Sequence, residues 1–150
     1  MNDDDRKQRL FRLFNEIGII NQLSTTLFNR RLPAGLHVSH FSVLNHLVRL
    51  GDGRTPLSIA EAFQVSKGTM TNTLTVLSRR GLVGLEPHPA DGRSKLVRLT
   101  AAGRDFHREA IASLDDAMER LEALLDVETL LAALPALAEL REALDRHRDL

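Results

Sequence analysis

Hydrogen-bonding and basic side chains gather on one side of a helix predicted over residues 67–80. Met70, Leu74 and Leu77 follow one another at steps of four and three, which is the spacing of a buried helix face. The opposite side has a cation at each end and carries Lys67, Gly68, Thr71, Asn72, Thr75 and Arg79. Asparagine pairs with adenine through two hydrogen bonds, and threonine offers a hydroxyl or a methyl group to a base edge. This side of the helix therefore has the chemistry needed to read the major groove of DNA.

A threonine-rich solvent face is the plainer interpretation of the same pattern. Threonine is a mediocre helix former, however, and this one helix holds Thr69, Thr71, Thr73 and Thr75. Gly68 lets the start of the helix approach a DNA backbone closely, and the free N–H groups there attract a phosphate. We therefore favour DNA contact over an ordinary solvated surface.

A second group of cations follows in "HPADGRSKLVRLT" (residues 88–100). Its Asp-Gly pair is a strong signal for a two-residue hairpin turn, because both residues tolerate positive φ. Arg93 at such a tip fits a minor groove about 6 Å wide, whose negative potential attracts a cation. We expect Asp91 to serve the turn and to hold the Arg93 guanidinium, and Lys95 and Arg98 to meet flanking phosphates. A solvent-exposed turn is the alternative.

Two helices are expected before these segments. Apolar residues recur at three- and four-residue steps over residues 6–31, and "RLPAG" ends that helix. A second helix is expected with Ser39 as its N-cap and a hydrophobic staple between Val38 and Val43. Its inner face would be formed by Phe41, Leu44, Leu47 and Val48.

The following segment has the spacing of a helix-turn-helix. A short helix should run over residues 59–63, because Ser58 and Glu61 stand at capping-box spacing. Ser66 should cap the longer helix 67–80. Two helices joined by about three residues fit a helix-turn-helix.

The pattern after Gly81 changes to two short β-type runs, residues 82–86 and 95–100, joined by "ADGRS". Helix, helix and two-stranded hairpin make a winged helix-turn-helix. Thr100 should then cap a long helix, whose apolar stripe holds Ile111, Leu114, Met118, Leu121 and Leu125. Pro135 should kink a last helical stretch or start a new helix there.

The charges are unevenly divided along the 150 residues, although they cancel overall. Residues 54–104, which include Arg54, carry a balance of +5, and residues 105–150 carry −7. A basic middle block favours a polyanionic partner, with chance and solvated helix faces as the alternative. Cysteine is absent, and no apolar run is long enough to span a bilayer or to form a signal peptide. We therefore expect a cytoplasmic protein without membrane contact.

Three segments together resemble the MarR (multiple antibiotic resistance regulator) family of transcription factors. They are "HVSHFSVLNHL", "LSIAEAFQVSKGTMTNTLTVLSRRGLV" and "PADGRSKLVRLTAAG", in that order and at family-like spacing. In the last segment an Asp and an Arg are separated by one residue. A strand that ends in Leu-Thr follows them, and a Gly stands three residues after that Thr. Two departures are the missing cysteine, which excludes thiol-based peroxide sensing, and Gly92, where many members have a second cation on the wing.

The resemblance implies a homodimer on a palindromic operator, released in many members by a small molecule that binds near the junction of the two parts. It implies a mainly α (α+β) fold: a winged helix-turn-helix over residues 37–103, between an N-terminal dimerisation helix (1–36) and C-terminal dimerisation helices (104–150). More apolar surface on the end helices than one winged module can cover also favours a homodimer over a monomer. The expected DNA contacts are Arg54, Ser66, Lys67, Gly68, Thr69, Thr71, Asn72, Thr75, Arg79, Asp91, Arg93 and Lys95.

Other functions have weaker support in the sequence. His40, His107 and Glu16 offer the only histidine-based metal set we considered, and surface or hydrogen-bonded core histidines are the favoured interpretation. No pairing of nucleophile and base and no glycine-rich phosphate loop points to an enzyme, and no cofactor is expected. The leading hypothesis is a repressor of transcription that responds to an unidentified small-molecule effector. The alternative is a winged helix that binds proteins and not DNA.

Overall fold

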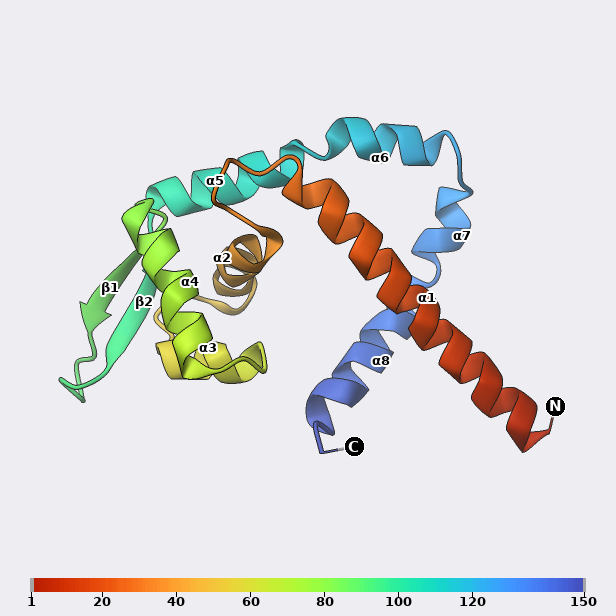
Figure 1. Cartoon of the computed structure of the whole chain (residues 1–150), viewed down its shortest axis with the longest axis horizontal. Coiled ribbons are helices and arrows are strands. Elements are labelled where there is room, and N and C mark those ends of the chain that lie inside the picture. The colour runs from red at the N-terminus through yellow and green to blue at the C-terminus, as the bar shows by residue number, and fades with distance from the viewer. Residues whose placement is uncertain (1, 150) are drawn as a thin grey trace. The chain divides into compact units, whose positions relative to one another are not determined.

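The computed structural model describes residues 2–149. The chain divides into two compact units, Met1–Leu114 and Asp115–Leu150. The first unit contains the helices α1 to α5 and a two-stranded sheet, and the second contains α6, α7 and α8 (Figure 1). The winged helix-turn-helix predicted from the sequence is therefore confirmed, and it lies in the first unit.

Helix α1 (Asp3–Asn29) starts three residues earlier than predicted. The Asn2 side chain accepts a hydrogen bond from the Asp5 N–H at 2.9 Å, and three aspartates fill the first turn. Negative charge at a helix N-terminus is stabilising, so this acidic start extends the helix beyond its apolar pattern. No residue of α1 is buried within its own unit.

Helix α2 (Val38–Leu50) is capped by His37 and not by Ser39 as predicted. The His37 N–H donates to His40 Nδ1 at 3.0 Å, and the Val38 N–H donates to Asn29 Oδ1 at 2.7 Å. These bonds satisfy N–H groups at the start of the helix, and the cap lies two residues before the expected one. The buried residues of α2 are His40, Val43, Leu44 and Leu47, whereas Phe41 is half-buried and Val48 is exposed. The prediction was therefore wrong for Val48.

The helix-turn-helix consists of α3 (Pro56–Ala62) and α4 (Lys67–Arg79). Thr55 caps α3 by accepting from the Ser58 N–H at 3.1 Å, which replaces the predicted cap at Ser58. The cause is the Thr-Pro pair, because proline at the first helical position needs no hydrogen-bond acceptor for its nitrogen. Ser66 caps α4 as predicted, accepting from the Thr69 N–H at 3.1 Å.

Strands β1 (Val83–Pro87) and β2 (Lys95–Leu99) pair antiparallel, from Val83 opposite Leu99 to Pro87 opposite Lys95. The loop before α3 joins them as a short third segment. The Gly53 N–H donates to the Val97 carbonyl at 2.8 Å, and the Val97 N–H donates to the Arg54 carbonyl at 2.8 Å. Side chains buried between these elements and the helices include Leu44, Leu47, Ile59, Leu77 and Val97.

Helix α5 (Ala101–Ala112) is capped by Thr100, as predicted, but ends before the predicted apolar stripe does. The Ser113 hydroxyl donates to the Ala110 carbonyl at 2.6 Å, and Arg31 Nε donates to the Ser113 carbonyl at 2.8 Å. The Arg31 side chain therefore takes an acceptor that a continuing helix would use, so the single long helix was a wrong prediction.

The second unit consists of α6 (Asp115–Glu122), α7 (Val127–Leu131) and α8 (Leu134–Arg146). Pro135 lies in the first turn of α8, which confirms the second of its two predicted roles. Asp126 caps α7 through hydrogen bonds from the Thr129 hydroxyl at 2.6 Å and the Thr129 N–H at 3.3 Å, and these bonds lower the Asp126 pKa. Nowhere in residues 2–149 is a helix both long and apolar enough to cross a bilayer.

Candidate nucleic-acid interface

A groove of about 410 Å³ separates α4 from the β1–β2 hairpin. The start of α3 closes one side of it. Six of the predicted DNA-contacting residues line this groove, three from α4 and three from the hairpin: Lys67, Thr71, Thr75, Asp91, Arg93 and Lys95. Residues far apart in the sequence are thus brought to one surface, as the sequence analysis expected.

The first turn of α4 has a charge that is unfavourable for the helix itself. It contains Lys67 and no acidic residue, although the positive end of the helix dipole favours acids there. Gly68 is exposed, and a Cβ added to it would meet nothing closer than Ser66 Oγ at 3.9 Å. A cation and an open backbone at a positive helix end are the features that a phosphate group requires.

The threonine hydroxyls of α4 are engaged by the helix itself. Thr71 Oγ1 donates to the Lys67 carbonyl at 2.8 Å, and Thr75 Oγ1 donates to the Thr71 carbonyl at 2.8 Å. The hydroxyl protons are used in these bonds, so the side chains present oxygen lone pairs and methyl groups. Lone pairs accept from the amino groups of adenine or cytosine, and methyl groups fit thymine. These two threonines are therefore suited to base edges more than to phosphates, which only accept hydrogen bonds.

The tip of the hairpin differs from the predicted two-residue turn. The ladder ends with the His88 N–H donating to the Ser94 carbonyl at 3.0 Å, and neither Asp91 nor Gly92 has positive φ. The tip is instead a turn in which the Ser94 N–H donates to the Asp91 carbonyl at 3.0 Å. The prolines in this segment lack the N–H groups that a longer ladder would need, which leaves a longer loop.

Asp91 has one of its two predicted roles. Its Oδ1 accepts from the backbone N–H of Arg93 at 3.0 Å, so the carboxylate serves the turn. Within residues 2–149 we find no bond from this carboxylate to the Arg93 guanidinium, which corrects that part of the prediction. The Arg93 side chain is exposed at the end of the hairpin.

Two other cations of the basic block are paired with groups of the protein at its surface. Arg54 Nε and Nη2 donate to the carbonyls of Gly51 and Leu50 at 3.0 and 2.5 Å, at the end of α2. Arg98 Nε donates to Glu86 Oε2 at 3.0 Å, and Arg98 Nη1 lies 3.4 Å from Asp52 Oδ1. The bond to Glu86, with a further contribution from Asp52, raises the pKa of Arg98.

The remaining predicted residues do not line the groove. Asn72 and Arg79 are exposed on α4 but do not line it. Ser66 and Thr69 pair through their hydroxyls at 2.9 Å. Part of the lining is apolar and was not predicted: Leu57 and Leu85 are 52% and 39% exposed. The alternation of β1 and the position of Leu57 directly after Pro56 were the available signals.

Comparison with known proteins decides the family. The MarR family profile matches residues 34–94. The multiple antibiotic resistance protein MarR of Escherichia coli is 31% identical over 134 residues, which cover 75% of this chain and 92% of that protein. This chain belongs to the MarR family of transcriptional regulators.

Solved structures agree with this family. A mutant MarR from E. coli complexed with operator DNA has 25% identity and a TM-score of 0.69, covering 88% of this chain and 95% of that one. The PcaV regulator from Streptomyces coelicolor, in complex with its natural ligand, has 24% identity and a TM-score of 0.65, covering 85% and 89%. The second likeness is one of fold.

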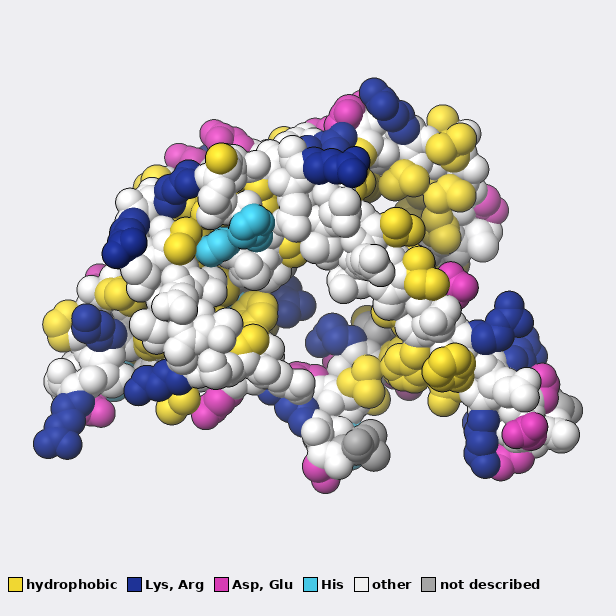
Figure 2. Space-filling model, viewed as in Figure 1, with side chains coloured by type: hydrophobic (Ala, Val, Ile, Leu, Met, Phe, Trp, Pro, Cys, Tyr) yellow, Lys and Arg dark blue, Asp and Glu magenta, His cyan; other side chains and the backbone are white. Residues whose placement is uncertain are grey.

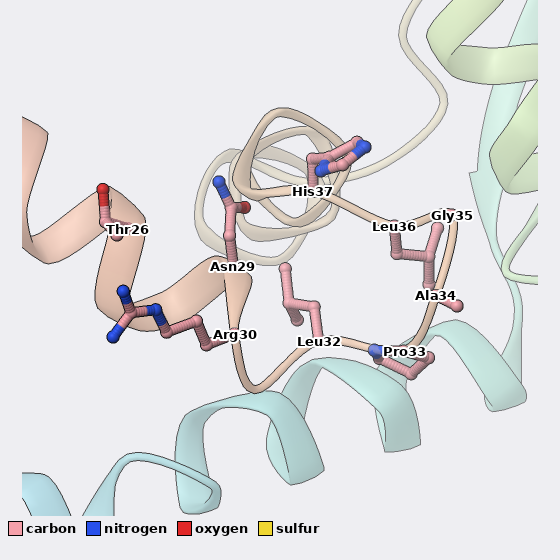
Figure 3. Close-up of a pocket in the computed structure, with 9 residues that line it drawn as sticks. All are labelled: Thr26, Asn29, Arg30, Leu32, Pro33, Ala34, Gly35, Leu36 and His37. Carbon is pink, nitrogen blue, oxygen red and sulfur yellow. The ribbon is translucent and has the colours of Figure 1, made fainter.

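The MarR-family chain has further hollows away from the groove, two of which involve the end of α1 or the start of α2. One, of about 430 Å³, lies between α1, the start of α2 and the helix-turn-helix, and Thr69, Met70 and Thr73 of α4 line it. The other, of about 390 Å³, lies between the end of α1 and the loop to α2, where Figure 3 shows Leu32 pointing inward. The Ala34 carbonyl in that loop accepts a hydrogen bond from Arg80 Nη2, at the C-terminal end of α4.

The histidines of this MarR-family chain are part of its packing. His40 is buried, and its ring lies 5.8 Å from that of His37. His107 stacks on Phe41 at 5.2 Å, and its Nε2 pairs with Asn45 Oδ1 at 3.0 Å. Burial lowers the pKa of both His40 and His107. Across residues 2–149 no three His, Cys, Asp or Glu side chains come together as metal ligands, so His40, His107 and Glu16 do not form the site considered above.

Proposed function

We propose that this MarR-family regulator is a homodimeric repressor that binds a palindromic operator. Each protomer reads one half-site with α4 and with the hairpin tip at residues 91–93. The observation that carries the proposal is the groove, because cations and base-reading groups from α4 and from the hairpin line the same surface. The complex of a mutant E. coli MarR with operator DNA supports it.

The proposed mechanism has a charge step and a reading step. Lys67 and Lys95, on opposite sides of the groove, attract the phosphate backbone and fix the register. Asn72 and the threonines of α4 then contact base edges in the major groove, and Arg93 enters the adjacent minor groove. The effect of Arg93→Ala should be a loss of about 1–3 kcal/mol in DNA binding.

Dimerisation is proposed from the apolar surface at both ends of the chain. Phe11, Ile20 and Leu23 of α1 are 72%, 61% and 65% exposed, and Figure 2 shows hydrophobic side chains gathered along that helix. Within the second unit, Leu124 and Leu134 are 78% and 56% exposed. Single proteins rarely leave contiguous apolar surface of this kind, and pairing with a second copy is the usual way to cover it. We therefore assign residues 1–36 and 104–150 to dimerisation and residues 37–103 to DNA binding.

The experiment that tests DNA binding uses a labelled duplex that the wild-type protein has selected from a random-sequence pool. Fluorescence anisotropy gives the affinity of wild type and of Arg93→Ala over a range of salt concentrations. We expect a steep loss of affinity with salt for the wild type and weaker binding for the variant at every concentration. Failure to select any sequence, or a flat salt response, would instead favour the protein-interaction module.

Dimerisation is tested by sedimentation of Ile20→Glu with Gln22→Glu as the matched control. Both variants place the same charge on α1, but Gln22 lies on the side opposite Ile20. We expect Ile20→Glu to sediment as a monomer and Gln22→Glu as a dimer. A monomeric wild type would contradict the proposed assembly.

We also propose that the small-molecule effector binds the hollow at the end of α1 shown in Figure 3. Its wall includes Ala34, whose carbonyl accepts a hydrogen bond from Arg80 at the end of α4. A ligand that moves Ala34 would therefore also move the end of the DNA-reading helix. Arg80→Gln should uncouple effector binding from DNA release. Any compound that releases DNA from the wild type should then still bind the variant, measured by calorimetry, but should no longer release its DNA.

A further inference from the structure

Asp52, on the loop between α2 and α3, joins three elements of the winged module. Its Oδ2 accepts from the Leu99 N–H of β2 at 3.1 Å and lies 3.6 Å from Arg104 Nη2 of α5. Its Oδ1 lies 3.4 Å from Arg98 Nη1. The Asp52 side chain is only 24% exposed. One carboxylate therefore connects the root of the hairpin, the start of α5 and the loop before α3.

Arg98 extends this connection across the hairpin. It is on β2 and donates to Glu86 on β1 at 3.0 Å, so its guanidinium spans both strands and the loop. Gly53 leaves room for it, because a Cβ at that position would lie 2.5 Å from Arg98 Nη1. Gly53 also has φ +76°, which side-chain-bearing residues rarely adopt. The chain is thus shaped to hold the guanidinium against the loop.

The backbone fixes the same place. The loop bonds to Val97 in both directions, at 2.8 Å each, so β2 is held on both edges near its middle. The tip with Arg93 starts only a few residues further on. A small rotation of a hairpin about its base moves the tip further than the base. A small change at Asp52 therefore displaces Arg93 much more than it displaces the core.

We infer that Asp52 and Arg98 are positioning residues that aim the wing at the minor groove and that neither of them contacts DNA. This inference rests on the proposed DNA-binding function. It replaces the earlier expectation that Arg98 meets a phosphate. It also accounts for an acid in a basic module, because an unpaired carboxylate there would only repel the DNA backbone.

The variant Asp52→Asn separates the two explanations by the sign of its effect. If charge alone matters, removing a negative charge tightens DNA binding. If Asp52 positions the wing, the loss of its charge-assisted bonds weakens DNA binding, by about tenfold. Asp105→Asn on α5 is the matched control, because Asp105 pairs with Arg108 and contacts no part of the hairpin in the described structure. It makes the same charge change and should leave affinity unchanged or slightly higher.

A double variant tests whether the effect passes through the wing. In an Arg93→Ala background, Asp52→Asn should cause little further loss, because the side chain that it positions is gone. A general loss of stability would instead add to the effect of Arg93→Ala. The Arg98 side chain is 43% exposed. The variant Arg98→Gln should show the same non-additivity with Arg93→Ala. Hydrogen exchange of the Leu99 amide, measured without DNA, should speed up in Asp52→Asn.

The outcomes are distinct. Tighter or unchanged binding by Asp52→Asn, or full additivity with Arg93→Ala, overturns the positioning role while DNA binding by the wild type stands. If the wild type selects no duplex, the proposed function fails first. In that case the Leu99 exchange measurement still decides whether Asp52 holds the root of the hairpin.

Discussion

Replacing Gly103 by alanine should destabilise the winged module, although Gly→Ala in a helix usually stabilises a protein. Gly103 is buried in the first turn of α5, against the junction of α4 and β1. A Cβ at this position would lie 2.1 Å from the Leu82 carbonyl oxygen and 3.0 Å from Leu99 Cδ1. Real Cβ atoms stay beyond 3.0 Å from such neighbours, so α5 must move away by about 1 Å.

The Leu82 carbonyl is a poor place for such a movement. It accepts from the Thr100 N–H at 3.2 Å and from the Thr100 hydroxyl at 3.0 Å. Overpacking costs about 1–3 kcal/mol, and weakening each hydrogen bond costs about 0.5–1.5 kcal/mol. The gain in helix propensity returns at most about 1 kcal/mol. We therefore expect Gly103→Ala to lose about 2–3 kcal/mol in the free energy of unfolding.

Urea unfolding at one fixed protein concentration measures this loss. Gly68→Ala is the matched control, since it makes the same change in a helix with no atom closer than 3.9 Å. We expect the control to gain up to about 0.5 kcal/mol from its reduced freedom when unfolded. A Gly103→Ala protein that unfolds at the same urea concentration as wild type would refute the packing argument.

Three further predictions concern DNA reading and pH. Asn72→Ala should relax the preference at one base pair in each half-site, as seen by selection from a random pool. Gly68→Ala should bind the selected duplex more weakly than wild type in anisotropy measurements, despite its added stability, because a Cβ separates the helix start from the phosphate. The free energy of unfolding should be constant above about pH 6.5 and should fall as the pH drops below that value. The reason is that burial lowers the pKa of His40 and His107 in the folded protein, so the unfolded chain binds protons at a higher pH than the folded one does. Urea titrations at several pH values should show a smaller loss of unfolding free energy at low pH for His40→Gln than for His147→Gln, a change outside this core. An equal loss would contradict the assignment of the pH effect to the buried histidines.

Features set by neighbouring residues could be predicted from the sequence. The caps at Ser66 and Thr100 are confirmed, and so is the buried face of α4, with Met70, Leu74 and Leu77. Each depends on a side chain and a backbone within one turn of it. The shared groove between α4 and the hairpin was not predicted, because it depends on how the two elements pack and not on either one alone.

The sequence did not show which of several neighbouring residues would cap a helix, form a turn or end a helix. Ser39 and Ser58 are good caps in isolation, but the helices begin earlier, after His37 and Thr55, so both serines lie inside a first helical turn. The Asp-Gly pair is a strong turn signal, yet the nearby prolines lengthened the loop around it. The end of α5 depends on Arg31, whose guanidinium reaches Ser113 from 82 residues away. No local pattern contains that information.

The partners of the arginines limit how many cations of the basic block can bind DNA. They also allow a quantitative test of the proposal that this block binds DNA. Of the eight cations in residues 54–104, four bind carbonyl or carboxylate groups of the protein: Arg54, Arg80, Arg98 and Arg104. The other four have no protein partner within the described structure and lie on α4 or the hairpin tip: Lys67, Arg79, Arg93 and Lys95. Half of the basic block therefore builds the module, and the other half is available to DNA.

This division predicts the number of phosphate charges that the protein neutralises. Each neutralised phosphate contributes about −0.9 to the slope of log affinity against log salt, so four cations in each of two protomers give a slope of about −7. A count that included all eight would give about −14. Anisotropy titrations of the selected duplex at several salt concentrations measure the slope directly. A value near the larger number would mean that the four paired arginines leave their carbonyl and carboxylate partners when DNA binds, and that the module is rebuilt on its operator.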